Sequence, residues 1–227
     1  MNISSPFLVP FIFDCDGVLV DSERLAHRIA MEQFLSLGLN VSYDDILGKA
    51  VKDIVQMITE RTKRDVPPEW IYQWAISIAN GFIRELQPVS GIQALLDTLK
   101  KRGHLIGVAS QSQLPRIQLS LHVTGLEQYF DKHIYSASMV AKPKPSPDIF
   151  LYAAASMGVD PSTCIVVEDS PLGVQAACAA GMKVYGYAAD QDAQKLREAG
   201  AHVFHSMHEL LALLLPSESQ PSYAVNM

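Results

Sequence analysis

The alternation of two kinds of segment after Pro88 limits the possible folds more than any other feature of this sequence. Short apolar runs typical of buried strands alternate with segments whose apolar residues repeat at helical spacing. Strands are predicted at 104–109, 164–167 and 183–187, and helices at 91–102, 114–123, 147–157, 171–180 and 206–215. Because such alternation forms a parallel sheet covered on both faces, we predict an α/β, Rossmann-like core.

A further apolar run near the start of the chain predicts one more buried strand, at 11–13. From about residue 22 to 86, by contrast, all signals are helical: apolar residues recur at helical spacing, with glycine or proline between the stretches. We therefore expect a small all-α domain, 22–87, inserted after the first strand. The core then comprises 1–21 and 88–216, and the polar residues 217–227 form a flexible tail.

Composition excludes several classes of function. The net charge is −6 and no basic block is present, so we expect no nucleic-acid partner. No apolar run approaches about 18 residues and no signal peptide is evident, so we expect no membrane partner and a cytoplasmic location. The three cysteines form a poor disulfide framework and are expected to be buried free thiols. We expect a monomer or weak dimer.

Polar side chains follow three of the predicted strands, where a parallel sheet binds its ligands. They are Asp14 and Asp16, then Ser110 and Gln111, then Glu168 and Asp169. Four carboxylates at one edge repel one another unless a divalent cation lies among them, and oxygen ligands without imidazole or thiolate favour Mg²⁺. Lys144, in a loop that opens a helix, supplies local positive charge. This combination suits phosphoryl transfer.

Four segments together resemble the motifs of the haloacid dehalogenase superfamily. They are DCDGVLVDSE at 14–23, VAS at 108–110, KPSPDIF at 144–150 and VEDSPLG at 167–173. The helical insertion resembles the small helical cap of the β-phosphoglucomutase-like and sugar phosphatase branch. The resemblance spans nearly the whole chain, and it carries weight because the four motifs occur in order, each at a predicted strand end or helix start.

The resemblance implies a role for each matching residue. Asp14 is the nucleophile, and Asp16 is the general acid for the leaving oxygen and then the base for the hydrolytic water. Ser110 binds the transferring phosphoryl group, and Lys144 steadies Asp14 and the phosphate. Lys142 competes with Lys144 for that role, but the spacing Lys-Pro-x-Pro-Asp favours Lys144.

The resemblance also implies a magnesium site. Asp14, the main-chain carbonyl of Asp16 and Asp169 bind the ion, and Glu168 assists directly or through water. An EF-hand calcium loop beginning at Asp14 is excluded, because its sixth and twelfth positions are Leu19 and Leu25 instead of glycine and glutamate.

Asp16 separates this chain from dehalogenases and phosphonatases, and favours phosphate esters. A histidine and an arginine that assist β-phosphoglucomutases fall by alignment on Ala26 and Val51, which weakens the mutase reading. We therefore expect a Mg²⁺-dependent phosphatase that hydrolyses a small phosphorylated metabolite, a sugar or sugar-acid phosphate, through an aspartyl-phosphate. The alternatives are a β-phosphoglucomutase-type phosphomutase and a non-catalytic binding module.

Substrate contacts are predicted from the inserted helices and from the loop after the second strand. Lys49 and Lys52 follow Gly48 in a loop expected to face the site, where they meet a polar or anionic part of the substrate. Gln111 replaces the asparagine that often follows the second-motif serine and is a further candidate contact. If Ser110 is considered alone, an alternative interpretation is that its side chain caps the next helix.

Overall fold

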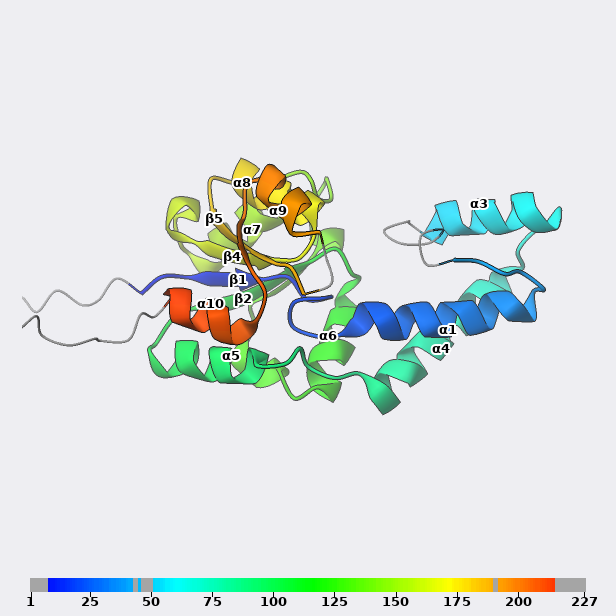
Figure 1. Cartoon of the computed structure of the whole chain (residues 1–227), viewed down its shortest axis with the longest axis horizontal. Coiled ribbons are helices and arrows are strands. Elements are labelled where there is room, and N and C mark those ends of the chain that lie inside the picture. The colour runs from blue at the N-terminus through cyan, green and yellow to red at the C-terminus, as the bar shows by residue number, and fades with distance from the viewer. Residues whose placement is uncertain (1–7, 43–44, 46–50, 190–191, 215–227) are drawn as a thin grey trace, which may run out of the picture.

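The computed structural model of the chain describes residues 8–42, 45, 51–189 and 192–214. Its centre is a six-stranded parallel sheet with strand order β3-β2-β1-β4-β5-β6 (Figure 1). The strands are β1 (Phe11–Phe13), β2 (Ile106–Ser110), β3 (Ile134–Ser136), β4 (Ile165–Glu168), β5 (Lys183–Tyr187) and β6 (His202–Phe204). The predicted α/β, Rossmann-like parallel core is therefore confirmed.

Side chains of β1 alternate between two hydrophobic cores, one on each face of the sheet. Phe11 and Phe13 contribute to the first, with residues of α5 (Ile92–Lys101), α6 (Leu114–Val123) and α10 (Met207–Leu214). Ile12 contributes to the second, with α7 (Asp148–Met157), α8 (Pro171–Ala179) and α9 (Ala193–Ala199). Helices thus cover both faces, as Figure 1 shows, which explains why β1 is apolar at every position.

The edge strands β3 and β6 and the short helix α9 were not predicted. Each edge strand has three residues, too few for a period-2 pattern, and the neighbouring strands β2 and β5 supply its hydrogen-bonding partners. Three 3₁₀ turns complete the α/β part: η1 (Glu127–Tyr129), η2 (Ala137–Met139) and η3 (Pro161–Thr163). One sequence expectation was wrong here, since Cys178 is exposed, while Cys15 and Cys164 are buried free thiols.

Between β1 and α5 the described residues form helices: α1 (Ser22–Ser36), α3 (Val51–Thr62) and α4 (Pro68–Glu85). α1 packs against α4, and a third hydrophobic cluster containing Phe34, Ile58 and Trp74 holds these helices together. Figure 1 shows all three displaced to one side of the sheet. None of the described helices is long and apolar enough to cross a membrane.

Candidate active site

Three adjacent strands, β2, β1 and β4, deliver polar side chains to the same edge of the sheet. Ser110 and Glu168 are the last residues of β2 and β4, and Asp14 directly follows β1. Asp169 and Lys144 join them, and all five residues are buried. Ionisable groups are almost never fully buried unless they are paired, so their arrangement calls for a chemical explanation.

Lys144 lies at the centre of this group. Its Nζ donates to Asp14 Oδ1 and to Glu168 Oε1, each at 2.5 Å, and to the carbonyl of Ala109 at 3.1 Å. Burial works to lower the pKa of Lys144, but the carboxylates of Asp14 and Glu168 outweigh it and hold the pKa above its ordinary value. The two carboxylates therefore favour the charged ammonium form of Lys144 beside Asp14.

The second oxygen of Glu168 is also engaged by the protein. Glu168 Oε2 accepts from the backbone amides of Asp169 and Ser170, at 3.0 and 2.9 Å, and from Ser170 Oγ at 3.0 Å. A Cβ at Gly173 would lie 1.8 Å from Glu168 Oε1, so a glycine is required there to admit the carboxylate. Glu168 thus holds Lys144 in place and is itself held by the start of α8.

The remaining negative charge is not balanced within this group, since three carboxylates face one ammonium. Burial raises the pKa of Asp14 to about 7, against the lowering effect of Lys144 and with a further rise from Glu168. Burial, together with Glu168 and Asp14, raises the pKa of Asp169 well above its ordinary value. The pairing with Lys144 therefore stabilises the lysine charge without fully stabilising that of Asp14.

A divalent cation fits the site because it would neutralise this surplus charge. Gly17 has a φ of +81°, and a Cβ there would lie 2.0 Å from Asp169 Oδ2, so a glycine keeps space beside that carboxylate. Among the described residues no three Asp, Glu, His or Cys side chains form a metal-binding group. Mg²⁺ does not need three, since it usually binds one or two carboxylates and keeps several waters.

Asp16 lies apart from Lys144 and has its own set of donors. Its Oδ1 accepts from Ser22 Oγ at 2.5 Å and from Arg116 Nη2 at 3.1 Å, and its Oδ2 accepts from Ser112 Oγ at 2.6 Å. Burial works to raise the pKa of Asp16, but the Arg116 charge and the two serine hydroxyls outweigh it and hold the pKa below its ordinary value.

The loop after β2 connects Ser110, the residue predicted to bind the phosphoryl group, with the loop that carries Lys144. Ser110 Oγ accepts from the backbone amide of Ser112 at 3.1 Å, and Gln111 Oε1 accepts from the backbone amide of Lys144 at 3.2 Å. Gln111, predicted as a substrate contact, therefore also braces the segment that carries Lys144. The neighbouring Lys142 is exposed.

Of the two lysines predicted to contact the substrate, the structure describes one. Lys52 is exposed in the first turn of α3, and Lys49 lies outside the residues that the structure describes.

The partners of Asp16 were missed by the sequence prediction. Ser22 was noted only in the first motif and at a helix start, Ser112 was noted after the second strand without a role, and Arg116 was not considered. A usable signal was present, because Ser112 lies directly after the strand that ends in Ser110 and Arg116 lies in the first turn of the next helix, so both are at the carboxyl edge of the sheet. In the structure both side chains turn toward the loop after β1.

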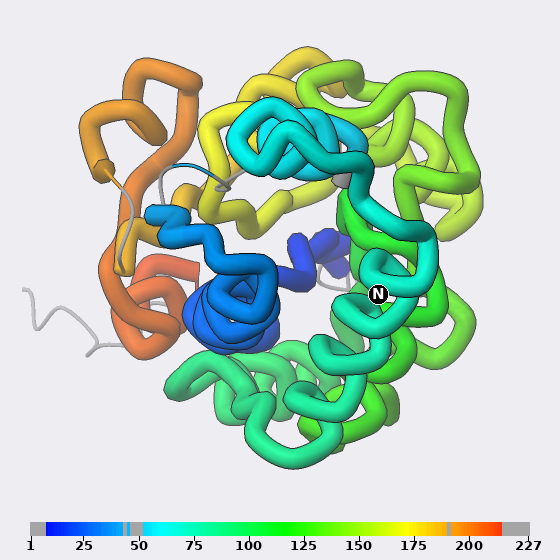
Figure 2. Tube along the Cα trace, turned by 90° about the vertical axis from the view of Figure 1, so that its right-hand side faces the viewer, coloured from blue at the N-terminus to red at the C-terminus, as the bar shows by residue number. Residues whose placement is uncertain are grey.

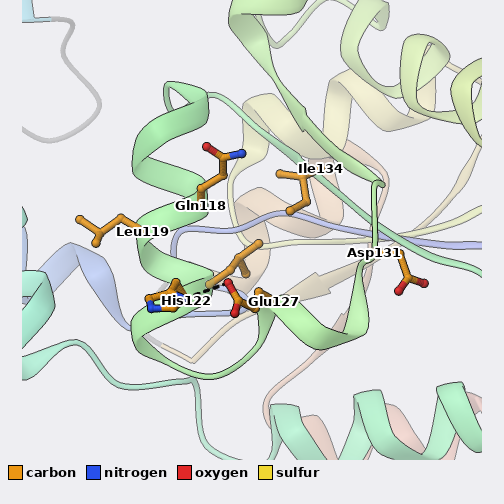
Figure 3. A pocket seen from close by; sticks show the side chains of 7 residues that line it. Gln118, Leu119, His122, Glu127, Asp131 and Ile134 are labelled. Atoms are coloured by element: carbon orange, nitrogen blue, oxygen red, sulfur yellow. Dashed lines mark hydrogen bonds and ion pairs between the residues drawn. The ribbon is translucent and has the colours of Figure 1, made fainter.

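A separate pocket of about 560 Å³ lies on the surface along α6, η1 and the beginning of β3 (Figure 3). It is lined by Gln118, Leu119, Leu121, His122, Glu127, Asp131 and Ile134. Ile134 begins β3 and Asp131 precedes it, so the pocket lies toward the amino ends of the strands. The carboxylates around Lys144 lie at the carboxyl ends, and the pocket has no part in the chemistry described above.

Comparison with known proteins identifies the family of this chain. A family model described as haloacid dehalogenase-like hydrolase matches residues 11–187. Hexitol phosphatase B of Escherichia coli is 34% identical over 178 residues, 76% of this chain and 80% of that protein. The 6-phosphogluconate phosphatase of Escherichia coli is 31% identical over 185 residues, 78% and 81% of the two chains.

Solved structures show the same relationship. The β-phosphoglucomutase of Clostridium difficile superposes with a TM-score of 0.72 at 26% identity, covering 90% of this chain and 93% of the other. The segment that matches the family model includes all four sequence motifs, and the fold has counterparts among solved structures. The chain belongs to the haloacid dehalogenase-like hydrolases, in the branch of the sugar phosphatases and β-phosphoglucomutase-like proteins.

Proposed function

We propose that this phosphoric monoester hydrolase is a Mg²⁺-dependent phosphatase of small sugar or sugar-acid phosphates, and that it acts through an aspartyl-phosphate on Asp14. The observation that carries the proposal is the buried contact of Asp14 with Lys144, at the end of the central strand β1. A buried carboxylate beside a fixed ammonium group is a preorganised nucleophile, and the same ammonium attracts an anionic phosphate.

In the first half-reaction an oxygen of Asp14 attacks phosphorus, and the bond from phosphorus to the ester oxygen breaks. Asp16 gives a proton to that oxygen, so the substrate leaves as an alcohol. Because its three donors favour the carboxylate, Asp16 must first take up this proton from solvent or from the bound phosphate monoanion. Lys144 remains charged and offsets negative charge on the phosphoryl oxygens, and Ser110 donates to one of them. Glu168 keeps Lys144 in position throughout, through the 2.5 Å contact between them.

In the second half-reaction water attacks the phosphorus of the aspartyl-phosphate. Asp16, now a carboxylate, accepts a proton from the water, and the bond between phosphorus and Asp14 breaks. Inorganic phosphate leaves and Asp14 is regenerated. The three donors around Asp16 suit this step because they stabilise the carboxylate form.

Asp14, Asp169 and the carbonyl of Asp16 are the groups that would hold Mg²⁺. The ion, when bound, supplies charge neutralisation at the phosphoryl oxygens. Glu168 has the weakest claim as a direct ligand, because both of its oxygens already accept hydrogen bonds from the protein. We assign it to positioning Lys144, with any metal contact passing through water.

Mg²⁺ should raise the melting temperature more at pH 8 than at pH 5.5. The pKa of Asp14 lies at about 7 without metal, so below that pH the ion must displace a proton, at a cost of about tenfold in affinity per pH unit. At pH 8 and 100-fold excess over Kd, the stabilisation is about 2.7 kcal/mol, or roughly 5–10 °C. Differential scanning fluorimetry measures both shifts. Equal shifts at the two pH values, or an undiminished shift in Asp169→Asn, would contradict the assignment.

We further propose that residues 22–87 form a cap that lies over the carboxyl edge of the core and selects the substrate. Its support is the separate hydrophobic cluster of α1, α3 and α4 and the two short links that join these helices to the sheet. In those links the backbone amide of Asp21 donates to Gln87, and that of Val89 donates to Leu19. Residues 1–21 and 88–216 then form the catalytic core.

Lys52→Ala combined with Lys49→Ala should raise KM for a sugar-acid phosphate while leaving KM for a neutral hexitol phosphate nearly unchanged. An exposed charge pair contributes up to about 1 kcal/mol, so the expected rise is up to about fivefold. Steady-state kinetics on 6-phosphogluconate and sorbitol 6-phosphate measure the difference. Lys101→Ala, an exposed lysine at the end of α5, is the matched control. Unchanged kinetics on both substrates would remove the two lysines from the substrate site.

A panel of phosphate esters with Mg²⁺ tests the function itself. We expect release of inorganic phosphate from sugar and hexitol phosphates, with some turnover of p-nitrophenyl phosphate. Glucose 1-phosphate with its bisphosphate belongs in the panel: isomerisation faster than hydrolysis would favour the phosphomutase alternative. Absence of turnover on every ester would favour a non-catalytic binding module.

A further inference from the structure

Arg116 is the only charged partner of Asp16 among the described residues. Ser22 and Ser112 reach the same carboxylate through hydroxyl groups, which rotate freely and can donate or accept. The guanidinium of Arg116 is planar, always charged and only able to donate. Of the three donors it therefore restricts the orientation of the Asp16 carboxylate most strongly.

A single short segment, 110–116, carries both the phosphate-site serine and the partners of Asp16. Ser110 ends β2, Ser112 follows two residues later, and Arg116 lies in the first turn of α6. The amide of Ser112 donates to Ser110 Oγ, while Ser112 Oγ donates to Asp16. The segment therefore sets the position of Asp16 relative to the oxygen proposed to bind the phosphoryl group.

The same guanidinium group of Arg116 also contacts α4. The guanidinium carbon lies 5.0 Å from the ring centroid of Phe82, a residue of α4 that is 1% exposed. Such stacking on an aromatic ring stabilises and orients an arginine side chain. α4 packs against α6 along this contact, and Figure 2 shows the two helices side by side. Arg116 thus connects the Asp16 carboxylate with a helix of the proposed cap.

We propose that Arg116 is a positioning residue for proton transfer, which aligns Asp16 with the leaving oxygen and is itself held by Phe82. The proposal rests on the phosphatase function proposed above. Arg116 touches neither phosphorus nor the leaving group, and it acts through Asp16. Its loss should therefore slow the first half-reaction more for esters that need a proton donor than for esters that do not, and kcat/KM reports that half-reaction. The second half-reaction, in which Asp16 is the base, is common to all esters.

The test compares esters whose leaving groups differ in their need for a proton. p-Nitrophenolate leaves readily without protonation, whereas the alkoxide of a hexitol phosphate does not. In Arg116→Met, which keeps an unbranched apolar stem but removes the guanidinium, kcat/KM for the hexitol phosphate should fall at least about tenfold more than kcat/KM for p-nitrophenyl phosphate. Arg116→Lys keeps a charged donor. It should restore much of the ratio of kcat/KM for the hexitol phosphate to kcat/KM for p-nitrophenyl phosphate.

Arg102→Met is the matched control, since Arg102 is exposed at the end of α5, before β2 and away from the site. Its ratio of the two kcat/KM values should equal that of the unaltered protein. Equal losses on both esters in a folded Arg116→Met would show a merely structural role and overturn the proposal. If Arg116→Met does not fold, Phe82→Leu is used instead: a selective loss on the hexitol phosphate supports the proposal, and an unchanged ratio overturns it. Turnover by the unaltered protein on neither ester would instead contradict the phosphatase function.

Discussion

Asp14→Asn should abolish phosphatase turnover and leave the fold intact. The amide is nearly isosteric with the carboxylate, so β1 and the contact with Lys144 are preserved, but it cannot attack phosphorus. Losing a nucleophile that acts in a catalytic group costs roughly 10⁴-fold or more in kcat. Because the pKa of Asp14 is raised by burial, replacing it by a neutral group should also leave the metal-free protein at least as stable at pH 8.

The matched control for this change is Asp131→Asn. Asp131 is an exposed residue before β3, at the amino edge of the sheet, where its φ of +47° is one that asparagine tolerates. Its turnover and melting temperature should match those of the unaltered protein. Beryllofluoride should be trapped on the unaltered protein and not on Asp14→Asn, as mass spectrometry or ¹⁹F NMR can show. Retained turnover in Asp14→Asn would overturn the nucleophile assignment.

Lys144→Met should both abolish turnover and strongly destabilise the protein. The lysine side chain is 2% exposed and bridges two carboxylates, so its removal leaves Asp14 and Glu168 buried without a cationic partner. Breaking a buried pair in this way lowers the free energy of unfolding by about 3–5 kcal/mol. Urea unfolding measures the loss, and Lys142→Met, at an exposed position two residues earlier, is the matched control.

The destabilisation caused by Lys144→Met should increase with pH. Lys144 lowers the pKa of Asp14, so in the variant that pKa rises further above the unfolded value and the folded state binds the proton more tightly. A raised carboxyl pKa gives stability at low pH that is lost as pH rises through the folded pKa. The loss should therefore be larger at pH 8 than at pH 5.5.

A second substitution separates charge from packing. Adding Glu168→Gln to Lys144→Met removes one unpaired charge, and it should recover about 1 kcal/mol or more at pH 8 without recovering turnover. The contrary result is a loss in free energy of unfolding that is the same at both pH values and unchanged by Glu168→Gln. That result would mean that lost packing, not buried charge, causes the instability.

Much of the fold could be predicted because the core of an α/β protein is encoded locally. β1, with three apolar residues buried between two layers of helices, was predicted at 11–13 and lies there. α6 was predicted at 114–123 with the bounds that the structure has. The edge strands β3 and β6 were missed because three-residue strands depend on hydrogen bonds to residues distant in sequence.

The site was partly predictable for a related reason. Parallel strands bring their carboxyl ends to one edge, so residues directly after strands, such as Asp14 and Asp169, can be grouped without coordinates. Gln111 shows the limit of this reasoning. It was predicted as a substrate contact from its place after Ser110, and the structure adds a hydrogen bond to the backbone of Lys144.

The family, the parallel core and the acidic edge at which Asp14 lies could be predicted before folding was considered, because they follow from periodicity and from the order of the motifs. The distribution of charge at that edge could not be predicted in this way, because it depends on contacts that form in the folded protein. Lys144 is shared between Asp14 and Glu168, and Asp16 is bound instead by Arg116. Residues 16 and 116 are far apart in the chain, and burial and distance, which set pKa values and pairings, exist only once the chain has folded.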